Sequence, residues 1–281
     1  MDLSSLALHP SNDVAESNSI KIEISNKKLD KKYLDNQFNI EKDYGYYNRN
    51  GVGFFEFYEG NRIVISNIST INNNFYHSLL NFPMACLMQQ RGYMPLHASV
   101  ISYKDNVIMF PGISRSGKSS LAALLLSKGA KLITEDIAVI YFLDSTPVAL
   151  PSYPLIKISS EIAKILNLSD RFVSKLDKNN SDRDVFSMHD SFCNKPKEID
   201  YLIFPKWVKK NKNVLIKKNS SESMREVLSS NLFIPSSKIS DNKFMKKNTQ
   251  LVRNTKIFEY QRDMDFQKLL NFEELLQTEL S

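Results

Sequence analysis

The apolar residues of this chain fall into short runs separated by polar turns, a pattern typical of alternating strands and helices. Residues 107–110 form a continuous apolar run, as expected for a strand buried on both faces. In residues 119–128 the leucines fall on one helical face, and Gly129 follows as a helix stop. The middle of the chain therefore predicts a strand, a loop and a helix in that order.

The first third of the chain predicts mostly strands. Residues 28–68 have a β-like composition, and the apolar runs 54–58 and 63–65 flank a turn, which predicts a β-hairpin. Residues 73–92 show helical spacing, and Pro83 either kinks this helix or begins a second one. The polar segment 1–26 is expected to be partly disordered.

The rest of the chain is also predicted to contain both strands and helices. The predicted strands are 96–103, 132–134, 137–143, 201–204 and 214–216, and the predicted helices are 160–166, 222–228 and 265–280. Residues 168–198 are polar and weakly patterned, so we expect a mobile insertion there. We predict an α/β fold with a β-rich and helical N-terminal portion, residues 1–92, followed by a core, residues 93–281.

Composition is that of a globular protein. Of 281 residues 42% are hydrophobic, and the net charge of +6 suits an anionic ligand such as a nucleotide. Cys86 and Cys193 lie far apart without metal-ligand spacing, so we expect two reduced thiols and a cytoplasmic protein. No apolar run approaches bilayer length, and residues 1–20 lack the features of a signal peptide.

The densest basic stretch is residues 206–218, which also contains Trp207. It could form a docking surface for an acidic peptide, a nucleic acid or a membrane. We favour the simpler interpretation, a solvated loop and strand face, and therefore expect neither a nucleic-acid nor a membrane partner.

The loop between the predicted strand and helix carries the candidate chemistry. It reads Gly112-Ile-Ser-Arg-Ser-Gly117-Lys118-Ser119 and matches G-x-x-x-x-G-K-[ST], the phosphate-binding (Walker A) loop. Glycines allow successive N–H groups to surround a phosphate, and the helix N-terminus adds its positive dipole end. The residues expected to contact the nucleotide are Gly112, Ile113, Ser114, Arg115, Ser116, Gly117, Lys118, Ser119 and Ser120. Lys118 would reach the β- and γ-phosphates and Ser119 would bind Mg²⁺, so we expect ATP and Mg²⁺ as ligands.

A kinase or hydrolase also needs a carboxylate near the γ-phosphate. Glu135 and Asp136 follow the next predicted strand, and the ends of parallel strands in a strand–helix–strand unit lie at one sheet edge. Asp144 ends another apolar strand, but without a crossover helix that strand should run antiparallel and point away. We therefore favour Asp136, while a turn or capping role for the acidic pair is the remaining alternative.

Together these stretches resemble a known family. Leu96-His97-Ala98-Ser99, the loop through Ser120, and Gly129-Ala-Lys-Leu-Ile-Thr-Glu135-Asp136 are similar to the HPr kinase/phosphorylase group of P-loop serine kinases, especially its smaller HPr-kinase-like relatives. The resemblance covers residues 93–145 and implies a P-loop kinase core of HPr-kinase/PEP-carboxykinase-like type. By resemblance, Asp136 would be the general base and His97 would support the acidic pair; alone, His97 reads as a buried, satisfied histidine. Lys118 would hold the phosphates, and Ser119 and Glu135 are the candidates for the metal.

Two departures from the family pattern limit what it implies. The acidic pair is Glu-Asp rather than Asp-Asp, which leaves the role of Glu135 open. The Glu-Ile-Arg-Gly-Leu-Gly segment of the bifunctional enzymes has no counterpart, so neither phosphorolysis nor recognition of HPr is implied. Relatives of this reduced type look like kinases of peptide-modification clusters, including lasso-peptide tailoring kinases. Asp182-Arg183 could supply a further basic contact, or could be an exposed surface pair.

The resulting functional prediction is transfer of the ATP γ-phosphoryl group to a serine hydroxyl of a peptide or small protein. Two alternatives stay open: a kinase of a small-molecule hydroxyl, and a non-catalytic ATP-binding sensor or assembly protein. A transporter-type ATPase is not supported, because the Leu-Ser-Gly-Gly-Gln signature is absent. The protein could act as a homo-oligomer.

Overall fold

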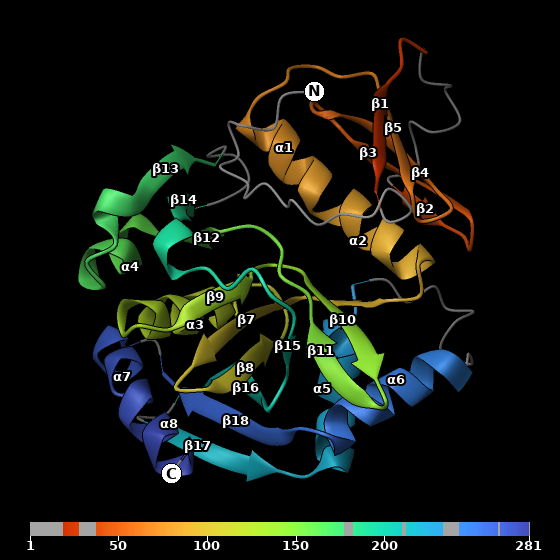
Figure 1. Ribbon diagram of the computed structural model, residues 1–281. Coiled ribbons are helices and arrows are strands. Elements are labelled where there is room, and N and C mark those ends of the chain that lie inside the picture. Colours follow the sequence, from red (N-terminus) through yellow and green to blue (C-terminus); the bar gives the residue numbers. More distant parts are fainter. Residues whose placement is uncertain are drawn as a thin grey trace. The chain divides into compact units, whose positions relative to one another are not determined.

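The computed structural model describes residues 19–27, 38–176, 182–209, 212–232, 242–263 and 265–280 (Figure 1). The chain separates into two compact units, Met1–Pro95 and Leu96–Ser281. Each unit is described by itself below.

The first unit contains a five-stranded sheet in the order β1-β5-β4-β3-β2. Its strands are β1 (Lys21–Ile24), β2 (Phe38–Ile40), β3 (Tyr44–Arg49), β4 (Gly53–Tyr58) and β5 (Arg62–Ser66). The predicted hairpin is confirmed as the antiparallel pair β4 and β5. Of the segment 1–26, which was expected to be partly disordered, residues 1–18 lie outside the described part of the chain, and residues 21–24 form β1, which pairs in parallel with β5.

Two helices, α1 (Asn73–Leu80) and α2 (Phe82–Gln90), follow the sheet. The Asn72 side chain caps α1 by accepting a hydrogen bond from the Phe75 N–H at 3.1 Å. Pro83 lies in the first turn of α2, where its missing N–H costs nothing, so of the two expectations the second helix is the one observed. Phe55 and Phe75, both fully buried with ring centroids 5.9 Å apart, join sheet and helix in one core.

The second unit is built on a six-stranded mixed sheet in the order β17-β18-β16-β8-β7-β9. Its strands are β7 (Ala98–Tyr103), β8 (Asn106–Pro111), β9 (Lys131–Thr134), β16 (Tyr201–Trp207), β17 (Asn213–Lys218) and β18 (Lys256–Arg262). β8 runs parallel to β16, as its apolar sequence predicts. β7 lies between β8 and β9 and is antiparallel to both, so β8 and β9 run in the same direction and end at the same sheet edge.

Helix α3 (Lys118–Ser127) packs with α7 (Phe266–Leu270) and α8 (Phe272–Leu280) against this sheet (Figure 1). The predicted helix 265–280 is two helices, joined at Asn271. The α3 leucines Leu121, Leu124 and Leu125 are fully buried in the core that they share with Phe272. Helices α5 (Ser220–Ser230) and α6 (Asn242–Arg253) pack against each other, and α6 has no counterpart among the sequence predictions.

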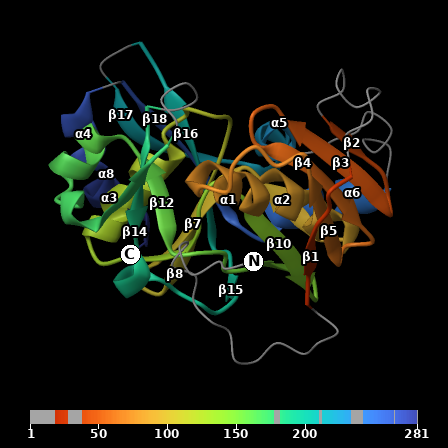
Figure 2. The same ribbon diagram turned by 90° about the horizontal axis from the view of Figure 1, so that it is seen from above.

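Two smaller sheets complete this unit. The first has the order β15-β11-β10-β6. β10 (Ala138–Leu143) forms a hairpin with β11 (Thr146–Ala149), which pairs with β15 (Lys197–Glu198). The boundary between the two units falls within β6 (Met94–Leu96). The other sheet has the order β12-β14-β13, made by β12 (Leu155–Ile158), β13 (Phe172–Lys175) and β14 (Asp184–Ser187) (Figure 1). Its strands β12 and β14 are also labelled in Figure 2. The expectation of a mobile insertion at 168–198 is therefore wrong: β13, β14 and β15 lie in it, and only residues 177–181 fall outside the described part.

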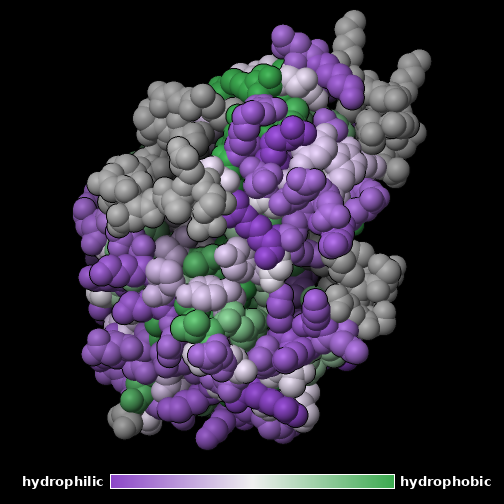
Figure 3. All heavy atoms as spheres, turned by 45° about the vertical axis from the view of Figure 1, so that its right-hand side comes forward, coloured by the Kyte–Doolittle hydropathy of each residue, from purple (hydrophilic) through white to green (hydrophobic). Residues whose placement is uncertain are grey.

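Hydrophilic side chains cover most of the molecular face drawn in Figure 3, with smaller hydrophobic areas between them, as on the surface of an ordinary folded domain. None of the helices in the described ranges is long and apolar enough to cross a membrane.

Candidate functional site

The phosphate-loop sequence forms a tight turn between β8 and α3, as its motif requires. The Gly112 N–H donates to the His97 carbonyl at 3.2 Å, and α3 begins at Lys118 directly after the loop. Gly117, the N-terminal cap of α3, has φ of +102°, a conformation that residues with a Cβ rarely adopt. Arg115 also has a positive φ, of +64°. The loop backbone is therefore curled at the end of β8, with a helix N-terminus beside it.

Lys118 is buried inside this loop, with 5% of its surface exposed. Its Nζ donates a hydrogen bond to the carbonyl of Ile113 at 2.8 Å. Burial lowers the pKa of Lys118 to about 8, against the opposing charges of Glu135 and Asp136. An anion that enters the loop could replace the carbonyl as partner and would favour the charged form of this lysine.

Ser119 and Glu135 meet across the two strand ends. The Ser119 hydroxyl donates to Glu135 Oε1 at 2.6 Å. Glu135 is 1% exposed, and among the described residues its Oε2 has no hydrogen-bond partner. Burial, followed by the neighbouring charge of Asp136, raises the pKa of Glu135.

This pair fits a Mg²⁺ ion. Hydroxyl and carboxylate oxygens are its usual protein ligands, and Glu135 offers an unpartnered oxygen beside Ser119. The described ranges contain no group of three or more His, Cys, Asp or Glu side chains that could hold a metal by themselves. A Mg²⁺ site here would therefore depend on phosphate oxygens and water for its remaining ligands.

Asp136 lies next to Glu135 and is held by two basic side chains. Lys157 Nζ is 2.9 Å from its Oδ2, and His97 Nε2 is 3.4 Å from its Oδ1. Burial alone would raise the pKa of Asp136, but Lys157 and His97 outweigh it and hold the pKa well below its usual range. Asp136 is thus a carboxylate at neutral pH, and its φ of +70° turns the chain away from β9 toward β10.

Lys157 is the main site residue that the sequence analysis missed. It lies on β12, where it is 4% exposed, and its pKa is raised because Tyr153, Asp136 and Glu135 outweigh the opposing effect of burial. The signal was present as a single lysine inside the apolar run Leu-Ile-Lys157-Ile, since a buried lysine needs a carboxylate partner.

The phosphate loop, His97 and Lys157 border a cavity of about 480 Å³, within the usual size range of small-ligand sites. Its lining includes His97, Lys118, Ser119, Lys157, Arg183 and Trp207. Arg183, one of the two residues of the expected basic contact, is therefore part of the cavity wall. The structure thus brings together the loop, the acidic pair and His97.

The structure also places two further residues that the sequence analysis named. Asp144 lies exposed in the β10–β11 turn, about 20 Å along the chain from the start of β10. The strand that Asp144 follows, β10, belongs to a different sheet from β9, so the expected antiparallel pairing of the two strands is not observed. Ile113 points outward with 65% exposure, so only its backbone belongs to the loop interior.

Comparisons with known proteins give little beyond the site itself. No family model matches the chain, and no curated protein matches it. Among solved structures, the Hpr(Ser) kinase/phosphatase from Coxiella burnetii is similar at 12% sequence identity and a TM-score of 0.35, covering 66% of this chain and 95% of that one. A TM-score of this size does not establish a shared fold, so the residues of the site carry the functional proposal.

Proposed function

We propose that the unit Leu96–Ser281 is an ATP-dependent kinase that transfers the γ-phosphoryl group to a hydroxyl group. The observation that carries this proposal is the 2.6 Å contact between Ser119 and Glu135. It joins the phosphate loop after β8 to the acidic pair after β9, beside a cavity that is lined by Lys118 and Ser119. A phosphate loop with an incidental lysine would not need a buried carboxylate at this position.

The loop and Lys118 would hold the nucleotide. The backbone N–H groups of the loop that are not already bonded within it, together with the N-terminus of α3, would favour phosphate oxygens, and Lys118 would exchange the Ile113 carbonyl for them. Mg²⁺ bound by Ser119 and Glu135 would compensate the phosphate charge. The protein's contribution is therefore positioning and charge compensation, which dominate phosphoryl transfer.

Asp136 would orient the acceptor hydroxyl and take its proton as the new O–P bond forms. Its Oδ1 is the less tightly held oxygen, because the His97 contact of 3.4 Å is longer than the Lys157 contact of 2.9 Å. With a pKa held low by Lys157, Asp136 is a weak base. Its orienting role should therefore matter more than early proton removal, and the proton would pass on to solvent.

The acceptor is proposed from the family resemblance: a serine of a peptide or small protein, such as a ribosomal-peptide precursor. A small-molecule hydroxyl is the nearest alternative within the same reaction class. One observation favours a second function, a nucleotide-binding sensor or assembly protein that transfers nothing: both carboxylate oxygens of Asp136 already have basic partners.

The test uses purified protein with Mg·ATP and candidate precursor peptides, and detects a phosphate-sized mass gain by mass spectrometry. Asp136→Asn should keep Mg·ATP binding but lower the transfer rate by about 10²–10⁴-fold, the usual contribution of an acid–base residue. Asn also tolerates the positive φ at this position. Lys118→Ala is the matched control and should lose nucleotide affinity in a calorimetric titration.

The outcomes separate the candidates. Unchanged turnover in Asp136→Asn would refute the assignment of Asp136. If the wild type and Asp136→Asn both bound Mg·ATP but neither phosphorylated any candidate peptide, the sensor would be favoured. If Lys118→Ala bound Mg·ATP like the wild type, the loop would not be the nucleotide site.

A further inference from the structure

Arg262 is a buried cation that lies next to Gly117 of the phosphate loop. It ends β18 and is 2% exposed, and its guanidinium lies 3.9 Å from the centroid of the Trp207 ring. Its Nη2 is 3.3 Å from the position that a Cβ on Gly117 would occupy. The guanidinium therefore lies on the indole ring, and both groups lie next to Gly117, the cap of α3.

No acidic side chain within the described ranges forms an ion pair with Arg262. Its Nε has no hydrogen-bond partner there, and Nη1 makes one long contact of 3.5 Å with the Asp263 carbonyl. The carboxylate of Asp263 is itself paired with Lys268. An arginine in a protein stays protonated, and burying an uncompensated charge is costly. The Asp263 charge attracts Arg262 through space, but this buried cation has no directly paired counter-charge among the described residues.

The stack of Arg262 on Trp207 is also hydrogen-bonded to the phosphate loop. Trp207 lines the cavity, and its Nε1 donates to the Arg115 carbonyl at 2.8 Å. Inside the loop, the buried Ser116 Oγ also has no hydrogen-bond partner among the described residues. Ser116 Oγ, Glu135 Oε2 and Arg262 Nε are thus three buried polar atoms around this loop that have no partner in the described part of the chain.

We propose that Arg262 is a positioning residue of the phosphate site, whose missing counter-charge is the phosphate group held by the loop. It acts through Gly117 and Trp207 rather than by touching the ligand: its charge favours an anion in the loop, and the stack keeps the loop curled. The ligand class is an oligophosphate, for which inorganic pyrophosphate is the minimal probe. This inference rests on the proposed function, since it assigns a further residue to the same site.

The test measures binding of pyrophosphate and of Mg·ATP by titration calorimetry in the full chain. Arg262→Met and Arg262→Gln remove the charge, and each should weaken both ligands by on the order of tenfold, the size expected for one partly screened charge at this range. Arg262→Lys keeps the charge and should restore most of the affinity. Arg253→Met, an exposed arginine at the end of α6, is the matched control and should bind as the wild type does.

Trp207 provides a second measurement. It is the single tryptophan of the chain and lines the cavity, so its fluorescence should change when either ligand binds to the wild type. Trp207→Phe keeps an aromatic face for Arg262 but removes the hydrogen bond to Arg115, and calorimetry should show a smaller loss than with Arg262→Met.

Each outcome decides a different point. If Arg262→Met and Arg262→Gln fold and bind pyrophosphate as tightly as the wild type, this inference is wrong while the proposed function stands. If Arg262→Lys is as weak as the neutral variants, shape rather than charge matters, and the inference is also overturned. If the wild type binds neither ligand, the proposed function fails and the inference falls with it.

Discussion

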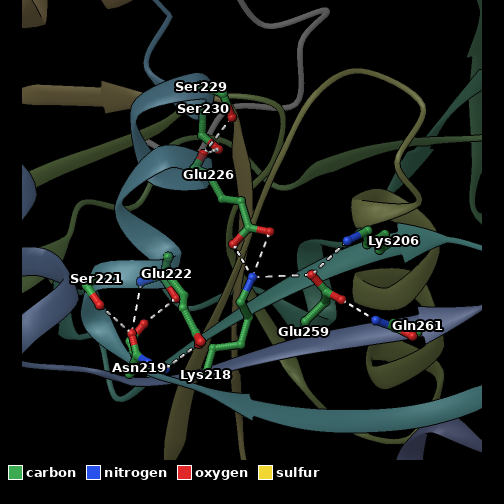
Figure 4. A network of polar contacts seen from close by, with 11 residues as sticks. Lys206, Lys218, Asn219, Ser221, Glu222, Glu226, Ser229, Ser230, Glu259 and Gln261 are labelled. Atoms are coloured by element: carbon green, nitrogen blue, oxygen red, sulfur yellow. Dashed lines mark hydrogen bonds and ion pairs between the residues drawn. The ribbon is translucent and has the colours of Figure 1, made fainter.

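Two clusters of lysines and carboxylates in the second unit differ in whether their charges are matched. Beside β18, Glu259 accepts hydrogen bonds from Lys206, Lys218 and Gln261, and both oxygens of Glu226 accept from Lys218 (Figure 4). Every carboxylate oxygen of that cluster has a donor. The second cluster, from here on the cavity cluster, consists of Glu135, Asp136 and Lys157. There, by contrast, Glu135 keeps an oxygen without a donor in the described ranges.

The difference separates a structural network from a binding site. The Glu259 cluster, from here on the matched cluster, joins β17, α5 and β18 and leaves nothing for a ligand to satisfy. Two of the six lysines in the basic stretch 206–218, Lys206 and Lys218, are ion-paired within this cluster. The cavity cluster is buried and incomplete, which is costly for folding but useful for binding an ion.

The largest expected effect comes from removing the lysine of the cavity cluster. Lys157→Met leaves Asp136 and Glu135 as buried carboxylates without their nearest cation. Breaking a buried pair in this way should lower the free energy of unfolding by about 3–5 kcal/mol, measured by urea denaturation at pH 7. Lys206→Met is the matched control: its side chain is 55% exposed, so it should cost less than about 1 kcal/mol.

The pH dependence should reverse between wild type and variant. In the wild type the pKa of Asp136 lies below its usual 3.8, so its ion pair stabilises the fold above pH 3.8 and is lost as pH falls through the folded-state pKa. Without Lys157 that pKa should lie above 3.8, so the variant's deficit should shrink on acidification. The double variant Asp136→Asn/Lys157→Met should recover part of the stability. A pH-independent deficit would mean that packing, not charge, is lost.

A smaller effect is expected from the titration of Lys118. Its pKa of about 8 means that the free protein loses this charge as pH rises above 8. Phosphate favours the charged lysine, so Mg·ATP affinity should be level below pH 8 and fall by about tenfold for each pH unit above it, with proton uptake on binding. Calorimetry at pH 7, 8 and 9 checks this, and Lys118→Met should show no such step. Equal wild-type affinity at pH 7 and pH 9 would contradict it.

The smallest effect is expected in the matched cluster. Glu226→Gln keeps the shape of a side chain that is 30% exposed and loses only its charge toward Lys218. The free energy of unfolding should change by about 1 kcal/mol or less, and the dissociation constant for Mg·ATP should not change. A change in nucleotide affinity would show that the two clusters are coupled, and the comparison drawn here would fail.

The local parts of the site were predictable because they are contiguous. The strand, loop and helix from residue 106 to 127 follow from apolar runs, glycines and one motif, and the meeting of Ser119 with Glu135 follows from the common direction of β8 and β9. That reasoning works even though β7 lies between the two strands, because β7 changes their spacing and not their direction.

The parts that come from distant segments were not predictable. Lys157 and Arg262 reach the site on β12 and β18, and neither belongs to a motif. The composition of residues 168–198 is polar and predicts no strands. β13 and β14 form there because β14 pairs with β12 and β13 pairs with β14, and their own hydrophobic pattern contributes little. Tertiary pairing overrides local propensity in such short strands.

The left-handed backbone at Asp136 restricts which residues could stand there. At a φ of +70°, aspartate, asparagine and glycine are tolerated, whereas other side chains cost on the order of 1–2 kcal/mol in steric strain. Glutamate, although chemically the nearest to aspartate, is therefore a poor substitute at position 136. In a saturation library, the backbone would restrict this position to three amino acids, and the ion pair with the buried Lys157 would favour aspartate among them.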